Sequence, residues 1–269
     1  DYAVLFELDR VRASNAGVPV LEPEQYDCIV LDEAQEFAPL ELALIGRSAS
    51  PPGSLIVAGD ADQQTDPNAC FTSGEESMRE LGRPSYERAV LPVSYRCPPS
   101  VVAIAKQMLQ PKQPLSAPGF ASAASVLAAS EPATNAFVHF ANECELGVWL
   151  VGELERLRAL DPKASVAVIC RRALTARRLY GMLRYANLGR LVTEGDFWFR
   201  AGVNVTHVDQ VKGLEFDFVI VPDASPATYP DQPDARRALY VAVTRARHQL
   251  VLGAVAGRSP LLALPDVTV

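Results

Sequence analysis

The sequence predicts an α/β fold in which mostly parallel sheets are flanked by helices. Two observations support this prediction. Short apolar runs rich in valine and isoleucine recur along the chain, which is typical of strands buried in a parallel sheet. Helical patterns lie between these runs, and strands that alternate with helices build mostly parallel sheets. The strands are expected at residues 28–32, 54–60, 136–140, 165–170, 203–208, 217–222 and 249–255.

The clearest expected helix covers residues 142–160. Asn142 and Glu145 resemble a capping box, in which two side chains satisfy N–H groups at the start of a helix. Apolar residues recur at helical spacing and define one face, made of Leu146, Trp149, Leu150, Leu154 and Leu157. A second helix is expected at residues 99–109, because proline suits the first helical position. Residues 111–130 are rich in Pro, Ala and Ser, which predicts an irregular connection.

The amino-acid composition limits the classes of protein to which this chain can belong. Of the 269 residues, 49% are apolar and 21% are charged, as in ordinary globular proteins. No apolar run approaches the ~20 residues of a membrane span, and the first residues lack the pattern of a signal peptide, so no membrane partner is expected. The five cysteines form no Cys-x-x-Cys pair. This scatter argues against a zinc site or a disulfide framework and predicts a reducing, cytoplasmic location.

The net charge of −7 is unevenly distributed along the chain. Residues 1–90 contain 17 acidic and 6 basic side chains, a net charge of −11. Residues 91–269 contain 15 acidic and 19 basic side chains, a net charge of +4. A charge step of this size predicts two units with different surfaces.

The first motif is "LDEAQEF", in which Asp32 and Glu33 follow an expected buried strand. Open α/β sheets bind ligands at the carboxyl ends of their strands. Magnesium takes hard oxygen ligands and keeps most of its waters, so one carboxylate is enough to hold it. The neighbouring carboxylate can orient and deprotonate an attacking water. The structural alternative is a strand that ends in a solvated acidic loop.

Two further motifs have weaker signals when taken alone. In "AGDADQQ", Asp60 is an acceptor after a second buried strand, and Gln63 presents an amide that could bond both a phosphate oxygen and water. In "SYRCPP", Arg96 could grip a phosphate through two parallel hydrogen bonds, and Tyr95 could stack on a base. The alternatives are a polar turn, a surface ion pair and a core tyrosine.

The fourth motif is "KGLEF", which bridges two strand-like runs. Gly213 allows a close turn, and Glu215 could accept a hydrogen bond from a ribose hydroxyl. Thr206, His207 and Lys212 could face a nucleic-acid backbone.

Arg245 lies in the fifth motif, "VTRAR", between an apolar helix and a strand. Each of the five motifs has an ordinary structural alternative, but together they resemble the UvrD/Rep/PcrA-type superfamily 1 DNA helicases. The matches are Walker B ("LDEAQEF"), motif III ("GDADQ"), motif IV ("YR"), motif V ("VKGLEFD") and motif VI ("LYVAVTRAR"). They occur in the family's order and span residues 27–252.

The resemblance implies that two RecA-like P-loop NTPase domains close on ATP and Mg²⁺. It implies that Asp32 holds the magnesium ion, directly or through water. Glu33 is then the general base, and Gln63 senses the γ-phosphate. Arg96 and Arg245 are the implied arginine fingers.

The resemblance also implies a nucleotide-binding set. Tyr95 stacks near the adenine and Glu215 binds the ribose, while Asp60 and Gly213 belong to the loops that shape this site. For nucleic acid, the aromatic residues that follow motif III in relatives are reduced to one candidate stacking platform, Phe71.

The chain departs from the family pattern at several places. Relatives have a histidine three residues before the motif V lysine, where this chain has Asp209. The large domain that many relatives insert is absent, because residues 186–203 offer only a short connection. These features resemble compact, divergent members, some of which associate with RNA polymerase.

The largest departure is the missing P-loop, since no Gly-Lys-Ser/Thr occurs in the chain. The chain is therefore interpreted as the C-terminal portion of a longer protein whose N-terminal half carries the Walker A loop. Residues 1–90 are expected to be the later half of a first RecA-like domain, and residues 91–269 a second RecA-like domain.

The expected function of the whole protein is ATP hydrolysis coupled to translocation on single-stranded DNA and to duplex unwinding. This piece alone is expected to be inactive. The alternative is a helicase-like module, without catalysis or with weak catalysis, that docks on a protein partner such as RNA polymerase.

Overall fold

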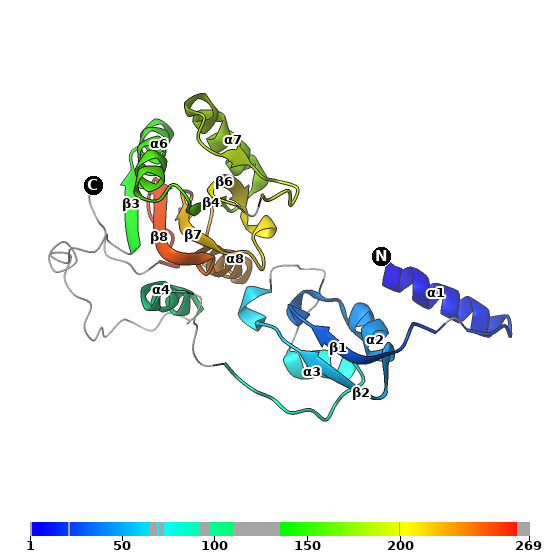
Figure 1. The fold of residues 1–269 in the computed structure, drawn as a ribbon. Coiled ribbons are helices and arrows are strands. Elements are labelled where there is room, and N and C mark those ends of the chain that lie inside the picture. The colour runs from blue at the N-terminus through cyan, green and yellow to red at the C-terminus, as the bar shows by residue number, and fades with distance from the viewer. Residues whose placement is uncertain are drawn as a thin grey trace. The chain divides into compact units, whose positions relative to one another are not determined.

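The computed structural model describes residues 2–20, 22–64, 69, 73–91, 97–109, 135–198 and 200–262 (Figure 1). The chain divides into two compact units, Asp1–Leu91 and Pro92–Val269, called unit 1 and unit 2 below. Residues 111–130, where the sequence predicts an irregular connection, lie outside the described part of the chain. Among the described residues, no helix is long and apolar enough to cross a membrane.

Unit 1 is built on two parallel strands, β1 and β2, whose ends pair at Leu31 and Val57. Its small core joins the end of β1 to two helices and comprises Leu31, Ala34, Leu42, Met78 and Leu81. Its elements are α1 (Tyr2–Asn15), β1 (Tyr26–Leu31), η1 (Ala34–Glu36), α2 (Pro39–Arg47), β2 (Ala49–Val57), η2 (Ala61–Gln63) and α3 (Gly74–Glu80).

Unit 2 contains a six-stranded sheet with the order β3-β8-β7-β4-β6-β5, and every paired strand in it runs parallel. The strands are β3 (Asn135–Phe140), β4 (Ser165–Cys170), β5 (Arg190–Leu191), β6 (Gly202–His207), β7 (Phe216–Val221) and β8 (Ala246–Val255). The helices are α4 (Pro99–Leu109), α6 (Glu143–Leu160), α7 (Ala173–Leu183), η4 (Arg184–Ala186), η5 (Val208–Gln210) and α8 (Pro233–Val243).

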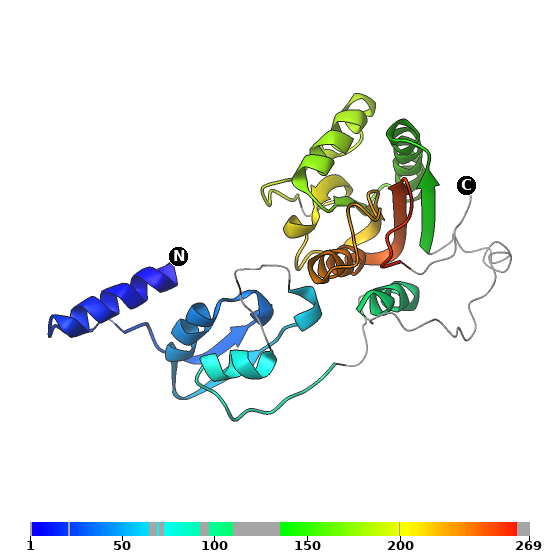
Figure 2. The same cartoon turned by 180° about the vertical axis from the view of Figure 1, so that it is seen from behind.

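The sheet of unit 2 separates two hydrophobic cores. One core packs α4 and α8 against the sheet, and the other packs α6 and α7 against it. Figures 1 and 2 show the two helix pairs on opposite faces of the sheet. The predicted α/β fold with mostly parallel sheets is therefore confirmed, and the three layers of unit 2 suit a RecA-like domain.

Helix α6 forms as its sequence pattern predicts. The Asn142 side chain accepts a hydrogen bond from the Glu145 N–H at 3.0 Å. In return, the Glu145 carboxylate accepts one from the Ala141 N–H at 2.7 Å. The apolar face is buried at Leu146, Leu150, Leu154 and Leu157, and Trp149 packs at its edge against Phe140.

Candidate functional site

Two adjacent strands of unit 1 place the first two motifs side by side. Because β1 and β2 are parallel, the residues that follow them emerge at the same edge of the sheet. The backbone joins the two connections there. The Ala58 N–H donates to the Leu31 carbonyl at 2.8 Å, and the Ala34 N–H donates to the Ala58 carbonyl at 3.0 Å. Asp32 and Asp60 therefore start from neighbouring positions.

Gln35 connects the two motifs through its side-chain amide. It is 1% exposed. Its Nε2 donates to Glu33 Oε2 at 2.6 Å, and its Oε1 accepts from the Asp60 N–H at 3.0 Å. The Glu33 N–H in turn donates to Asp32 Oδ1 at 2.9 Å. The sequence patterns did not identify Gln35 as a site residue. The signal that could have identified it is a glutamine two residues after the adjacent carboxylates Asp32 and Glu33.

Backbone geometry at Glu33 and Gly59 makes these contacts feasible. Glu33 has φ +53°, in the left-handed region that non-glycine residues occupy at a cost. Such strained backbones cluster at functional sites. A Cβ atom on Gly59 would lie 2.6 Å from Gln35 Oε1, so a glycine is needed for the amide to approach.

The Asp60 carboxylate organises the second motif. Its Oδ1 accepts from the Asp62 N–H at 3.0 Å, and its Oδ2 accepts from the Gln63 amide at 2.8 Å. The structure thus links four predicted site residues in one hydrogen-bonded chain through Gln35, in the order Asp32, Glu33, Gln35, Asp60 and Gln63.

In unit 2, Arg245 joins the end of α8 to the loop that enters β7. Its side chain is buried. The guanidinium donates to the carbonyl oxygens of Val241 and Leu214, both at 3.1 Å. It also donates to Thr244 Oγ1 at 3.2 Å. Gly213, in the same loop, has φ +69°, a left-handed conformation that favours glycine.

Arg247 lies beside the predicted ribose-binding residue, which sequence reasoning did not foresee. Its Nε lies 3.7 Å from Glu215 Oε2, and its Nη1 lies 3.9 Å from Asp217 Oδ1. The Arg247 side chain is 52% exposed, whereas Arg245 is enclosed. The available signal was the second arginine of "TRAR".

Asp217 anchors the start of β7 to β4. Its Oδ2 accepts from the N–H and the hydroxyl of Ser165, at 2.9 and 2.8 Å. Burial acts to raise the pKa of this carboxyl, but the hydrogen bonds from Ser165 and the nearby His248 and Arg247 outweigh it, so the pKa is lowered. Asp217 is thus held as a carboxylate.

Two of the predicted nucleic-acid contacts, Thr206 and His207, lie at the end of strand β6. Thr206 is fully buried and His207 is 8% exposed. Thr206 Oγ1 and His207 Nδ1 are buried without a hydrogen-bond partner among the described residues. Burial lowers the pKa of His207, against the opposing effect of Asp209. Nucleic-acid contact by Thr206, His207 and the partly exposed Lys212 stays a prediction.

Three predicted site residues, Tyr95, Arg96 and Phe71, lie outside the part of the chain that the structure describes. Their predicted roles in adenine stacking, phosphate binding and base stacking therefore stay predictions.

Residues 202–252 match the family model of the UvrD-like helicase C-terminal domain. The matched segment contains β6, β7, α8 and the loop of Gly213 and Glu215. The UvrD-like recognition made from the motifs is therefore confirmed, and the chain carries a helicase-related C-terminal domain.

The chain is also similar to the crystal structure of the C-terminal domain of a possible DNA helicase from Lactobacillus plantarum WCFS1. The sequence identity is 26% and the TM-score is 0.48. The match covers 64% of this chain and 93% of that chain. A comparison with curated proteins finds no match.

Proposed function

We propose that this chain is the C-terminal part of an ATP-dependent superfamily 1 DNA helicase or translocase. One observation carries the proposal. In unit 1, the hydrogen-bonded chain from Asp32 to Gln63 lies at the carboxyl ends of adjacent parallel strands, where α/β proteins bind ligands. The UvrD-like segment of unit 2 supports the choice of a helicase.

In this proposal Asp32 holds Mg²⁺ and Glu33 is the general base. Asp32 is exposed, and its Oδ1 is oriented by the Glu33 N–H. The described residues contain no cluster of three or more potential metal ligands. Magnesium needs only one or two carboxylates when phosphate and water complete its shell, so the donor set suits it. The ion would neutralise charge on the phosphates.

Gln35 would position the base. Its amide donates to one oxygen of the Glu33 carboxylate, which leaves the other oxygen for the attacking water. Gln63 would report the γ-phosphate. Its amide donates to Asp60 in this structure, and a phosphate oxygen would compete for the same donor. If the Gln63 amide exchanged Asp60 for the phosphate, the conformation of the η2 segment would depend on whether the γ-phosphate is present.

The remaining nucleotide contacts would come from unit 2. Glu215 would accept from the ribose, and Gly213 would keep its loop close to the nucleotide. Arg96 and Arg245 would stabilise charge on the transferring phosphate. Because Arg245 donates to the Leu214 carbonyl, its release toward a phosphate would loosen the loop of Glu215. Arginine release and ribose binding would thus be coupled.

The proposal includes an N-terminal half that carries the Walker A loop. Parallel sheets are normally covered on both faces. In unit 1, however, Val30 on β1 and Ile56 on β2 are 66% and 56% exposed. Further strands and helices of the same protein would cover these apolar side chains and supply the phosphate-binding loop.

The test uses the longer protein that includes a phosphate-binding loop. We expect ATP hydrolysis stimulated by single-stranded DNA. Glu33→Gln should lower kcat by about 10²-fold or more, since general-base catalysis contributes on that order. Glu36→Gln, three residues away, should retain turnover. A folded longer protein with no DNA-stimulated hydrolysis would refute the proposal and favour a helicase-like module that docks on a protein such as RNA polymerase.

A further inference from the structure

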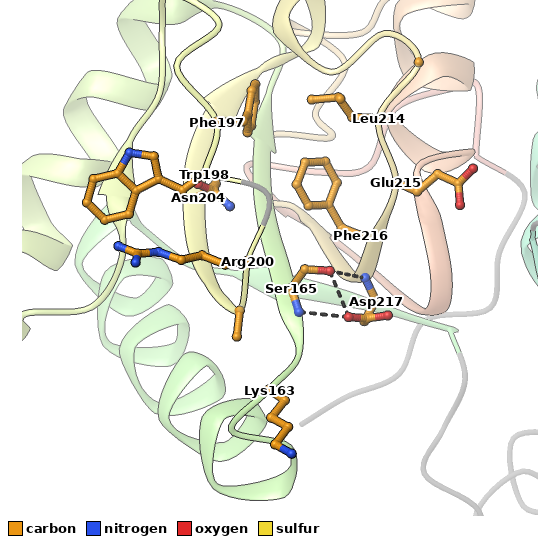
Figure 3. A pocket seen from close by; sticks show the side chains of 12 residues that line it. Lys163, Ser165, Phe197, Trp198, Arg200, Asn204, Leu214, Glu215, Phe216 and Asp217 are labelled. Atoms are coloured by element: carbon orange, nitrogen blue, oxygen red, sulfur yellow. Dashed lines mark hydrogen bonds between the residues drawn. The ribbon is translucent and has the colours of Figure 1, made fainter.

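A pocket of about 470 Å³ opens in unit 2 at the amino-terminal edge of the sheet (Figure 3). It lies where the chain enters β4, β6 and β7, and it is shaped in part by the short connection between β5 and β6. Six of its lining residues carry the argument: Lys163, Phe197, Trp198, Arg200, Asn204 and Phe216. None of them was assigned a role in the nucleotide site above.

One wall of the pocket is aromatic and flat. Trp198 is 57% exposed, although the Arg200 guanidinium carbon lies 4.1 Å from its ring centroid. Arg190 also lies over this ring, at 4.2 Å, and it is held by an ion pair with Asp196. Figure 3 shows Arg200 extended along the Trp198 ring. Because both guanidinium groups lie over the indole, a nucleobase would extend the stack over the planar Arg200 guanidinium.

The inner part of the pocket is apolar. Phe197 and Phe216 face each other there, with ring centroids 5.9 Å apart and a tilted geometry. Figure 3 shows both rings between the Trp198 wall and the Glu215 loop. A nucleobase can pack against this apolar surface, whereas a sugar or a phosphate alone gains nothing from it.

Two basic and two acidic side chains line the same opening, namely Lys163, Arg200, Glu215 and Asp217. Arg200 and Lys163 line the pocket, and within the described residues neither pairs with a carboxylate. The nearby acids are engaged, because Ser165 bonds Asp217 and Arg247 lies beside Glu215. The two cations are therefore available to an anion such as a phosphodiester.

Asn204 adds a polar group that lacks a partner. It is 6% exposed, on β6, and within the described part of the chain its amide makes no hydrogen bond. Asn204 lines the pocket, so a ligand there can reach its amide and gain a hydrogen bond. Asn204 and Trp198 line the same pocket. The amide donor and acceptor of Asn204 can pair with the edge of a base.

We propose that this pocket binds one unpaired nucleotide. The base stacks on the Trp198–Arg200 wall, Asn204 bonds its edge, and Lys163 with Arg200 attracts the phosphate. A nucleotide of a single-stranded nucleic acid and a free nucleotide share this chemistry. The choice of DNA as the first probe rests on the proposed function. The pocket borders the proposed ribose-binding loop, because Gly213 and Glu215 also line it, whereas the proposed general base and magnesium ligand lie in unit 1.

The direct test follows the fluorescence of Trp198 in the 269-residue chain. The chain has two tryptophans, so Trp149→Phe leaves Trp198 as the sole reporter. The chain is titrated with dT12, with dA12 and, separately, with AMP and ATP without magnesium. Saturable quenching is expected with the oligonucleotides. Quenching by AMP or ATP at equal or lower concentration would identify a free nucleotide as the ligand instead.

Variants test the role of each wall by fluorescence anisotropy with labelled dT12 and dA12. Trp198→Leu should weaken binding about tenfold, as expected for loss of one stacked base. Arg200→Ala should weaken binding and reduce the salt dependence by about one phosphate contact. Asn204→Leu should abolish any preference between dA12 and dT12. Melting curves from circular dichroism establish that each variant is folded.

The matched control is a second arginine–aromatic pair on unit 2. Arg184 lies 4.7 Å over Tyr185, which is 81% exposed and does not line the pocket. Tyr185→Leu and Arg184→Ala should leave oligonucleotide affinity within twofold of the parent chain. Equal losses of oligonucleotide affinity in the two arginine–aromatic pairs would overturn the pocket proposal. They would indicate non-specific attraction to the protein surface.

Two failures remain distinguishable. If the parent chain binds oligonucleotides but Trp198→Leu binds equally well, the pocket proposal is wrong and the proposed helicase function stands. If the parent chain binds neither oligonucleotides nor nucleotides, the pocket proposal is also wrong. The helicase proposal is then judged separately by DNA-stimulated hydrolysis in the longer protein.

Discussion

At the scale of single residues, Gln35 is the side chain that organises unit 1. Both ends of its amide are used, one by the Glu33 carboxylate and one by the Asp60 N–H. Because it is buried, neither bond can be replaced by bulk water without local opening. Gln35 therefore makes the two acidic motifs a single structural element.

Gln35→Leu tests this role. The variant leaves the Asp60 N–H without its acceptor, so this amide should exchange with solvent faster. The free energy of unfolding should fall by about 1 to 3 kcal/mol, the cost of an unmade buried hydrogen bond. Hydrogen exchange and urea unfolding measure the two effects. Gln232→Leu, at an exposed site, should change stability by less than about 0.5 kcal/mol.

Asp223 is a buried carboxyl group at the end of β7. Burial raises its pKa to about 6, although the Arg171 N–H donates to Oδ2 at 3.0 Å. Its Oδ1 and the neighbouring Tyr229 hydroxyl are buried without partners among the described residues. The nearby Cys170 thiol is also buried, and its pKa is raised. The enclosure therefore favours neutral Asp223.

This raised pKa predicts a pH-dependent stability. The folded state binds the proton more tightly than the unfolded chain, whose Asp has a pKa of about 3.9. The contribution of Asp223 to stability is therefore complete below about pH 4 and is lost as the pH rises through 6. The amide of Asp223→Asn does not titrate. Between pH 4 and pH 7 the free energy of unfolding of this variant should therefore rise by about 2 to 3 kcal/mol relative to that of the parent chain.

Urea unfolding of both proteins across this pH range measures the difference. Asp217→Asn is a control of opposite sign, because the pKa of Asp217 is lowered and its contribution is lost as the pH falls. A stability difference between Asp223→Asn and the parent chain that stays constant with pH would contradict the prediction.

At the scale of elements, α6 shows a helix whose start and buried face are both encoded locally. Asn142→Ala removes the acceptor for the Glu145 N–H. The variant should lower the free energy of unfolding by about 1 kcal/mol. Glu155→Ala, on the exposed face of the same helix, should change it by less than about 0.5 kcal/mol. Equal effects in urea unfolding would show that the cap is not formed in solution.

The predictability of the other elements depends on their length and neighbours. Residues 165–170 form β4 as predicted, because five consecutive apolar residues follow Ser165 and carry a clear pattern. The two-residue strand β5 was not predicted, since Arg190 and Leu191 are too few to show a period. Strand β2 starts at Ala49, before the predicted residue 54, because prolines tolerated at a sheet edge hide it from sequence patterns.

At the scale of the whole molecule, the chain holds part of a proposed nucleotide site but lacks its phosphate loop. No Gly-Lys-Ser/Thr occurs in the 269 residues, and that loop supplies both backbone N–H groups and a lysine to the phosphates. The isolated chain should therefore release phosphate from ATP at a rate close to background, with or without single-stranded DNA. Phosphate-release assays measure this. Robust turnover that Glu33→Gln abolishes would contradict it.

The charge of the chain also belongs to this scale. The −11 of residues 1–90 and the +4 of residues 91–269 make unit 2 the more attractive to nucleic acid. The proposed pocket lies in unit 2, and its cations were present in the sequence. The sequence did not predict that Lys163 and Arg200 line one opening, because Lys163 precedes β4 and Arg200 precedes β6.

The sequence by itself determined the parallel α/β architecture, the face and cap of α6, and the UvrD-like motifs, because each is encoded in residues close together along the chain. The tertiary structure decided which groups meet. It placed Gln35 between Glu33 and Asp60, enclosed Arg245 while leaving Arg247 exposed, and assembled Trp198, Arg200 and Asn204 around a pocket. These contacts depend on sheet register and crossover geometry, which join segments distant in sequence.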